Sequence, residues 1–318
     1  MALNDLIQIL KEKTQPADWS PHKYTTLYRN RKLWGNFFGL PMLKNNEGQL
    51  SIKKTISNMV FVRALFATIK NGLKNSGENY NLIVNCDDDW LVYEKDRIAK
   101  DGTRYRMYKD TREKHKGKSV YLQTPTAKLT CNEVTKGRAR TWSKNIGMQD
   151  ELVVCPFAWK RWLGDAPPYL SDFAGTPFSG IKGETLDRLK YRAAGNTLLH
   201  EALHALNLVE YDISQLATSR NTLLETNIIN QDLGDLSVQY GGKTQGAYGA
   251  EGVQALARKD PNKVLHNADT YAMFALGVYY DKCNWANALG KCLDDSPDTI
   301  CPEDEKTKER NCITIDWN

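Results

Sequence analysis

The stretch TLLHEALHALNLVEYD, Thr197–Asp212, decides how the rest of the chain is interpreted, because it places two histidines at helical spacing. His200 and His204 are two of the five histidines in the 318-residue chain, and Glu201 lies between them. On an α-helix, residues four positions apart stack on one face, so both imidazoles can point at a common atom. Glu201 is rotated by about 100° from His200 and flanks that point without competing as a ligand.

This HExxH pattern predicts a zinc-binding helix in which Glu201 takes a proton from metal-bound water. Structural zinc sites close four protein ligands, whereas catalytic sites keep three and leave the fourth position to water. Because no CxxC pair or further HxxxH pattern accompanies the motif, we expect an open, catalytic site. The alternative is a pair of helix histidines that are satisfied by ordinary hydrogen bonds.

The third ligand has several candidates. Asn207 stands where a helix can end in a left-handed residue, and a turn there would bring Glu210 or Asp212 towards the metal. The spacing of HEALHALNLVE is then similar to the metzincin pattern HExxHxxGxxH, with Asn in place of Gly and Glu in place of the last His. Alternatively, both acids are solvated residues that follow the helix.

The rest of the chain alternates helical and strand-like patterns. Apolar periodicity predicts helices at 53–72 and 264–280, and short β-branched runs predict strands at 81–86, 119–123 and 150–157. The segment Lys95–Lys118 is expected to form a twisted hairpin with its turn at Asp101-Gly102. The glycine-rich segment 240–252 is expected to be a loop.

Composition restricts the partners of the protein. With 41% hydrophobic and 25% charged residues, the composition is that of an ordinary globular chain. The sequence contains no run of about eighteen apolar residues, the pattern that would predict a membrane-spanning helix. The net charge of +5 is small, and acids are interspersed in the basic hairpin, so no nucleic-acid partner is expected. The start, MALNDLIQILKEK, lacks the apolar region of a signal peptide, so the chain is interpreted as a mature form.

Seven cysteines favour an oxidising compartment. Four of them are nearly evenly spaced in a polar tail that could hardly form its own core: Cys283, Cys292, Cys301 and Cys312. Disulfides are expected to staple this tail, with one thiol of the odd total left over. The protein is therefore expected to be secreted.

Four stretches together resemble a known family. They are NLIVNCDDD around Cys86, LVVCPFAW at 152–159, HEALH at 200–204, and AYGAEGVQALARKDPNKVLHNADTYAMFA at 247–275. In this order they resemble the deuterolysin-like aspzincins, secreted fungal and bacterial metalloendopeptidases that include the peptidyl-Lys endopeptidases. The resemblance implies an α+β, zincin-like domain over 53–285, mainly helical with a small antiparallel sheet and an active-site HExxH helix. Residues 1–52 are then an N-terminal extension, and 286–318 a Cys-rich tail.

The resemblance also implies site residues. In the family an Asp replaces the third histidine within a GTxxDxxYG segment, and the Tyr of YG stabilises the tetrahedral intermediate. Tyr248-Gly249 matches YG, but position 245 is Gln, and the nearest similar element is LGDLSVQYGGKTQGAYG. Asp235 is therefore the favoured third ligand, ahead of Asp212 and Glu210. Alternatively, Asp235 is an ordinary turn residue after Gly234.

Asp269 falls on the acid of NADTY, which in the Lys-specific members binds a basic side chain just after the scissile bond. Its alternative role is that of a helix N-cap. The sequence thus predicts a monomeric zinc endopeptidase with one ion, Glu201 as the base, a protein or peptide substrate, and no membrane partner. The alternatives are a metzincin-like protease that uses Glu210 or Asp212, and a catalytically weak zincin-like protein that binds zinc or acts as an effector.

Overall fold

A computed structural model describes fourteen parts of the chain: residues 3–7, 21–39, 52–74, 82–112, 121–124, 131, 139–142, 150–164, 178–190, 194–205, 233–287, 290–292, 299–300 and 313–314. Several predictions lie outside the described residues. They concern Glu210, Asp212, Cys301 and Cys312.

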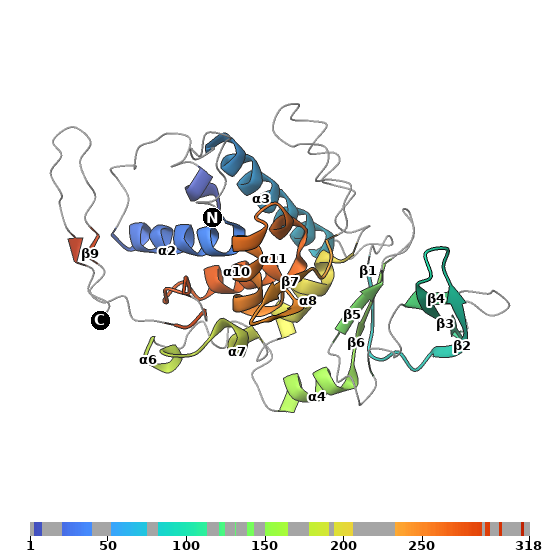
Figure 1. Cartoon of the computed structure of the whole chain (residues 1–318). Helices are drawn as coiled ribbons and strands as arrows, with labels where there is room; N and C mark the ends of the chain where they lie inside the picture. Colours follow the sequence, from blue (N-terminus) through green and yellow to red (C-terminus); the bar gives the residue numbers. More distant parts are fainter. Residues whose placement is uncertain are drawn as a thin grey trace.

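The core of the molecule is a group of helices around α11 (Ala268–Tyr279) (Figure 1). The sequence of α11, ADTYAMFALGVY, is apolar on nearly all sides, and a helix of this kind is stable when other elements cover it all round. It packs against α2 (Pro21–Phe38), and its Phe274 meets Trp34 edge-to-face with ring centroids 5.6 Å apart. The remaining helices are α3 (Ile52–Lys74), α4 (Pro156–Gly164), α6 (Phe178–Ile181), α7 (Leu186–Lys190), α8 (Ala194–Leu203), α10 (Gly249–Lys259) and the 3₁₀ helix η3 (Lys263–His266).

A small mixed sheet lies beside the helices. It has the order β1 (Leu82–Asn85), β6 (Asp150–Val154), β5 (Ala139–Trp142); β1 runs parallel to β6, and β5 runs antiparallel to it. Every residue of β6 is buried, as expected of a central strand. The sheet contacts α8 through β5.

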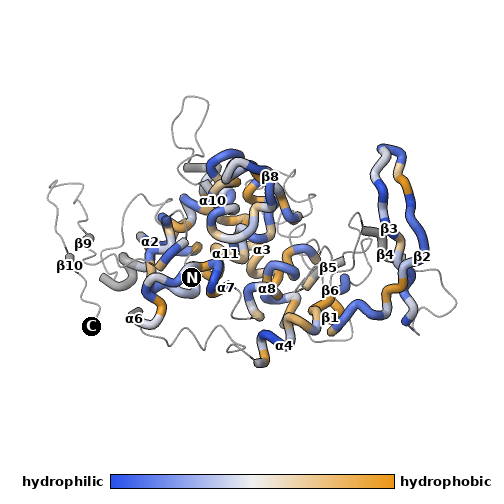
Figure 2. Tube along the Cα trace, turned by 60° about the horizontal axis from the view of Figure 1, so that its bottom comes forward, coloured by the Kyte–Doolittle hydropathy of each residue, from blue (hydrophilic) through white to orange (hydrophobic). Residues whose placement is uncertain are grey.

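A second sheet projects away from the helices (Figure 1). It is antiparallel and consists of β2 (Leu91–Ile98), β3 (Arg104–Asp110) and β4 (Tyr121–Thr124). Its β2–β3 hairpin is largely hydrophilic (Figure 2). Two short antiparallel pairs complete the fold: β7 (Ser237–Tyr240) with β8 (Lys243–Gly246), and β9 (Thr299–Ile300) with β10 (Ile313–Thr314).

These elements form the expected mixture of helices and strands, and most of the predicted segments are confirmed. The helix at 53–72, the strand at 81–86 and the hairpin turn at Gly102 are present. The described part of the strand predicted at 119–123 lies in β4, and the strand predicted at 150–157 ends at Val154 because α4 begins at Pro156. The predicted loop at 240–252 is wrong for most of its length, because residues 243–246 form β8 and α10 begins at Gly249. Only Gly241 and Gly242, both with positive φ, form a two-residue turn between β7 and β8. The predicted helix at 264–280 is divided into η3 and α11.

The expected division into domains stays a prediction. The described part of residues 1–52 contributes Trp34 and Phe37, both fully buried, to the same hydrophobic cluster as α11. A disulfide joins Cys283 to Cys292 across the predicted boundary at 285, and a second one joins Cys131 to Cys155. Within the described residues, Cys86 is an exposed free thiol, and every helix is too short or too polar to cross a bilayer.

Arg112 connects the projecting sheet to the mixed sheet. Its guanidinium pairs with Asp110 at the end of β3 and with Glu151 of β6, at 2.7 Å from Glu151 Oε2. Its Cζ also lies 3.5 Å from the centroid of the Trp90 ring. The side chains of Asp110 and Glu151 are only 4% and 3% exposed, so the guanidinium supplies a positive charge that two buried carboxylates share.

We predict that Arg112→Met lowers the free energy of unfolding by about 3 kcal/mol, because it removes the guanidinium that pairs with two buried carboxylates. Urea unfolding followed by circular dichroism measures the change. Arg104→Met is the matched control, since Arg104 pairs with Asp96 at the surface and its removal should leave the midpoint unchanged. Equal effects of the two substitutions would contradict the connecting role of Arg112.

Candidate metal centre

Helix α8 presents the motif at its C-terminal end. The Asn196 side chain donates a hydrogen bond of 2.9 Å to the carbonyl of Ala272 and so fixes α8 against α11. His200 and Glu201 lie in the last turn of the helix, whereas His204 follows one residue after its end. The backbone N–H of His204 bonds to the carbonyl of Glu201 at 3.1 Å, so a tighter turn keeps His204 on the side of His200.

Three side-chain atoms converge at this end of α8. The two histidine Nε2 atoms lie 3.2 Å apart, and Asp235 Oδ1 lies 3.2 Å from Nε2 of His200 and 3.4 Å from Nε2 of His204. These donor atoms lie within 4.8 Å of one another, which makes the group a candidate for holding a metal ion. The structure therefore brings the favoured third ligand to the predicted pair.

The position of Asp235 is fixed by the start of α11. The backbone of Gly234 exchanges hydrogen bonds with His266 and Ala268, at 2.9 and 3.0 Å. The Asn267 side chain accepts from the N–H of Leu236 at 3.1 Å and donates to the carbonyl of Ala247, also at 3.1 Å. Thus one asparagine binds the chain on both sides of the β7–β8 hairpin, and Asp235 and Tyr248 lie near each other despite their separation in sequence.

Both histidines have their second ring nitrogen engaged. Nδ1 of His204 lies 2.6 Å from the carbonyl oxygen of Leu233, and Nδ1 of His200 lies 3.0 Å from Oδ1 of Asp269. Because both partners are acceptors, each Nδ1 carries a proton, and each Nε2 can offer its lone pair to a cation held between the histidines and Asp235. This is the arrangement that orients histidine ligands of metals.

The electrostatics of the group favour a positive charge at its centre. Burial lowers the pKa of His200, but the carboxylates of Asp235 and Asp269 outweigh it and raise that pKa to about 10. Burial likewise raises the pKa of Asp235, but the two histidines outweigh it and hold that pKa far below its usual range. A proton or a metal cation between these groups is therefore strongly stabilised.

Asp269 is the polar centre beneath the cluster. Its side chain is fully buried, and it accepts hydrogen bonds from Lys190 Nζ at 2.5 Å and from the backbone N–H of Gly249 at 2.5 Å, in addition to His200. Burial raises its pKa, but Lys190 and His200 outweigh that effect and lower it to about 2. Asp269 is therefore ionised and joins α7, α8 and α10 to α11.

Tyr248 stands immediately before α10, with extended backbone angles. The first N–H groups of α10 bond to carboxylates of other helices: Gly249 to Asp269, and Ala250 to Asp187 Oδ1 at 3.1 Å. The Tyr248 ring, 46% exposed, lies with its centroid 6.1 Å from that of His200. Burial and the Asp235 carboxylate raise the pKa of Tyr248, so its hydroxyl keeps its proton at neutral pH.

Glu201 is 7% exposed, and its charge helps to raise the pKa values of His200, His204 and Tyr248. The structure thus brings five predicted residues together: His200, Glu201, His204, Asp235 and Tyr248.

The sixth predicted residue, Asp269, lies beneath them, and its contacts are inside the chain. Its alternative role as the N-cap of its own helix is wrong, because the N-cap position is Asn267 and Asp269 accepts from Gly249 of α10 instead. Its predicted contact with substrate stays a prediction. Glu210 and Asp212 lie outside the described residues.

Lys190 and Asp187 contact the residues around the candidate centre, and the sequence did not predict them. Both lie in α7, LDRLK, in which Leu186, Leu189 and Lys190 are buried. A lysine next to the leucines of a short amphipathic helix was the available signal, because a buried lysine needs an anionic partner.

Comparison with known proteins adds no assignment. No model of a protein family matches the chain, and neither a curated protein nor a solved structure matches it significantly. The candidate centre therefore rests on the geometry of this chain.

We predict that Gly249→Ala lowers the free energy of unfolding by about 3 kcal/mol, since a methyl group there would overlap Asp187 Oδ1 and the backbone has a φ of +69°. Gly242→Ala is the matched control, because Gly242 also has a positive φ, +78°, but open space around it. The Gly242→Ala substitution should lower the free energy of unfolding by about 1 kcal/mol, from the backbone strain alone. Equal losses in urea unfolding would show that the contact with Asp187 does not constrain α10.

We predict that Lys190→Met in metal-free protein also costs about 3 kcal/mol, because it leaves the buried Asp269 carboxylate without its lysine. The double variant Lys190→Met/Asp269→Asn should be less destabilised than the sum of the two single variants, by about 2 kcal/mol. Urea unfolding in the presence of a chelator measures this coupling, and Lys259→Met, on the exposed surface of α10, is the control. Strictly additive losses would contradict a direct pair.

Proposed function

We propose that the protein is a zinc-dependent endopeptidase that holds one zinc ion with His200, His204 and Asp235. The observation that carries the proposal is the convergence of two imidazole nitrogens and one carboxylate oxygen within 4.8 Å. Zinc binds these atom types, and its catalytic sites use three protein ligands. The hydrogen bonds at both Nδ1 atoms support the same assignment, because they orient each Nε2 towards the site.

The chain's own residues can perform the remaining chemistry. A zinc ion in this place supplies a Lewis acid that polarises a peptide carbonyl and lowers the pKa of water. Glu201 is the general base that takes up a proton and passes it to the leaving amine. The protonated hydroxyl of Tyr248 donates a hydrogen bond to the developing oxyanion, as its raised pKa permits.

Asp269 and Lys190 are positioning residues in this proposal. Asp269 holds Nδ1 of His200 and the N–H of Gly249, so it sets the distance between a metal ligand and the residue after Tyr248. Lys190 keeps that carboxylate charged in a buried place. A preference for a basic residue after the scissile bond stays a prediction. In the structure the Asp269 carboxylate is already paired with Lys190 of the same chain.

The finer parts of the proposal are a zincin-like domain related to the deuterolysin-like aspzincins, secretion, a monomeric state, and a protein or peptide substrate. Asp235 upstream of Tyr248-Gly249 supports the family, since it supplies the carboxylate that position 245 lacks. The disulfides Cys131–Cys155 and Cys283–Cys292 support secretion.

We predict that Glu201→Gln cleaves denatured casein at least about 100-fold more slowly than the unaltered chain while it retains one zinc ion per chain, because it loses the base and keeps the ligands. Cleavage is followed by the release of new amino groups, and zinc by elemental analysis.

Two further variants complete the test. Asp235→Ala should lose zinc and activity together, whereas Asp260→Ala, at the end of α10, should keep both. Equal cleavage by the unaltered chain and Glu201→Gln, with zinc bound to both, would contradict the proposed peptidase activity. It would favour a zinc-binding protein without catalysis. Full retention of zinc by Asp235→Ala would reject Asp235 as a ligand.

A further inference from the structure

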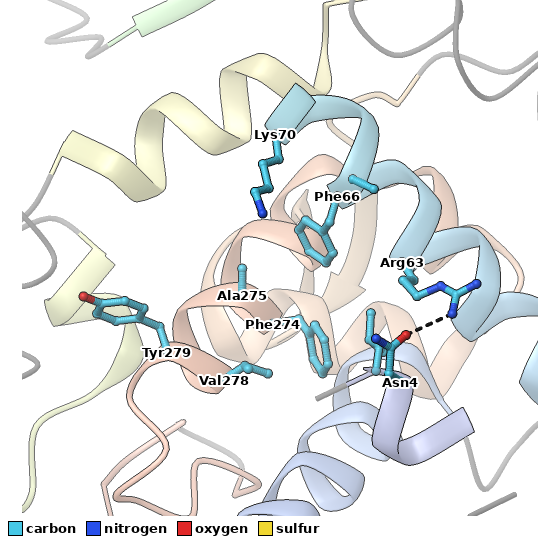
Figure 3. Close-up of a pocket in the computed structure, with 10 residues that line it drawn as sticks. Asn4, Arg63, Phe66, Lys70, Phe274, Ala275, Val278 and Tyr279 are labelled. Atoms are coloured by element: carbon cyan, nitrogen blue, oxygen red, sulfur yellow. Dashed lines mark hydrogen bonds between the residues drawn. The ribbon is translucent and has the colours of Figure 1, made fainter. Parts of the chain in front are cut away.

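A cavity of about 370 Å³ lies beside α11 (Figure 3). The helical spacing of the α11 residues that line it places it on the face away from Asp269. The short helix at 3–7, the middle of α3 and the C-terminal half of α11 surround it. Its volume is in the range of cavities that hold small organic molecules. Within the described residues, its lining includes none of the candidate metal ligands.

The floor of this cavity is apolar and already formed. Leu3, Phe66, Phe274 and Val278 line it, and Phe66 packs edge-to-face on the buried Tyr271 with ring centroids 6.0 Å apart. Leu3 and Phe274 are 8% and 2% exposed, so the surrounding core holds them in place. The cavity is therefore suited to the hydrocarbon part of a ligand.

The rim of the cavity is positively charged. Arg63 and Lys70 lie two turns apart on α3, roughly 10 Å along the helix axis. None of the described residues that line the cavity is acidic. In Figure 3 the Arg63 guanidinium turns to Asn4, whose Oδ1 accepts its hydrogen bond at 2.9 Å, whereas the Lys70 side chain extends towards Ala275.

We propose that this cavity binds an amphipathic carboxylate, a medium-chain alkyl acid such as decanoate. Its carboxylate pairs with the Lys70 ammonium, and its chain lies between Phe66 and Phe274. An apolar floor below a cationic rim matches a ligand with a hydrocarbon body and a single anionic head. A cationic amphiphile with the same chain would place its charge beside Lys70 and Arg63, where like charges repel. The proposal does not depend on the function of the metal centre.

The first test is calorimetric titration of the full chain with decanoate and, separately, with decyltrimethylammonium. We expect one decanoate per chain, and an affinity for decyltrimethylammonium at least about tenfold weaker, because an attractive charge contact is replaced by a repulsive one. Equal affinities for the two probes would overturn the proposal, because they would show that the rim charges select nothing.

The second test uses variants of the cavity. Ala275→Trp fills it and should abolish binding of decanoate, and Lys70→Glu should weaken binding at least about tenfold. Lys160→Glu, an exposed position on α4, is the matched charge control and should leave affinity unchanged. Ala67 is an exposed residue of α3 on the opposite wall of the cavity. Ala67→Trp also fills the cavity, and it replaces Ala275→Trp in the test if that variant does not fold.

Two results would overturn the proposal at this stage. Unchanged decanoate binding in a folded cavity-filling variant would place the ligand elsewhere. The second result is a chain that self-associates and does not bind decanoate, but becomes monomeric on the substitution Ala275→Trp or Ala67→Trp. This result would show that a second copy covers the cavity.

Discussion

The buried carboxylate of Asp269 is the constraint on which the candidate centre depends. A charge with no exposure to water is tolerable only when partners surround it, and here they come from three other helices: Lys190 of α7, His200 of α8 and the first N–H of α10. The requirement to satisfy one carboxylate therefore fixes the relative positions of four helices. The same contacts orient a candidate ligand and place the residue after Tyr248.

Asn267, two residues earlier, performs a similar task with neutral groups. Its amide binds the backbone at Leu236 and at Ala247, and the N–H of Ala247 donates to the carbonyl of Leu236 at 2.7 Å. The hairpin β7–β8 thus leaves and rejoins the core at adjacent points. The length of this hairpin therefore has no effect on the distance between Asp235 and Tyr248, and a carboxylate thirteen positions upstream of the tyrosine lies near it.

The sequence predicted the parts of this arrangement that depend on local spacing. Helical periodicity located α3 and α11, and the i, i+4 rule placed His200 and His204 together. Spacing alone offered Glu210 and Asp212, and Asp235 was added only by a resemblance to a known family. A ligand from another segment depends on the path by which the chain returns to the site, and here that path is held by Asn267. Lys190 was missed for the same reason, since its need for an anion is met by a residue 79 positions away.

Helix α11 connects the two sites of the molecule. One face near its N-terminus carries Asp269 beneath the candidate metal centre, and the opposite face towards its C-terminus lines the apolar cavity. An apolar helix must be covered on all sides; within the described residues α11 packs against α2, α7, α8 and α10, and the cavity lies between it and α3. A ligand in the cavity would add to this cover. Because it would bind the folded chain and not the unfolded one, it would stabilise the helix that holds His200 in place.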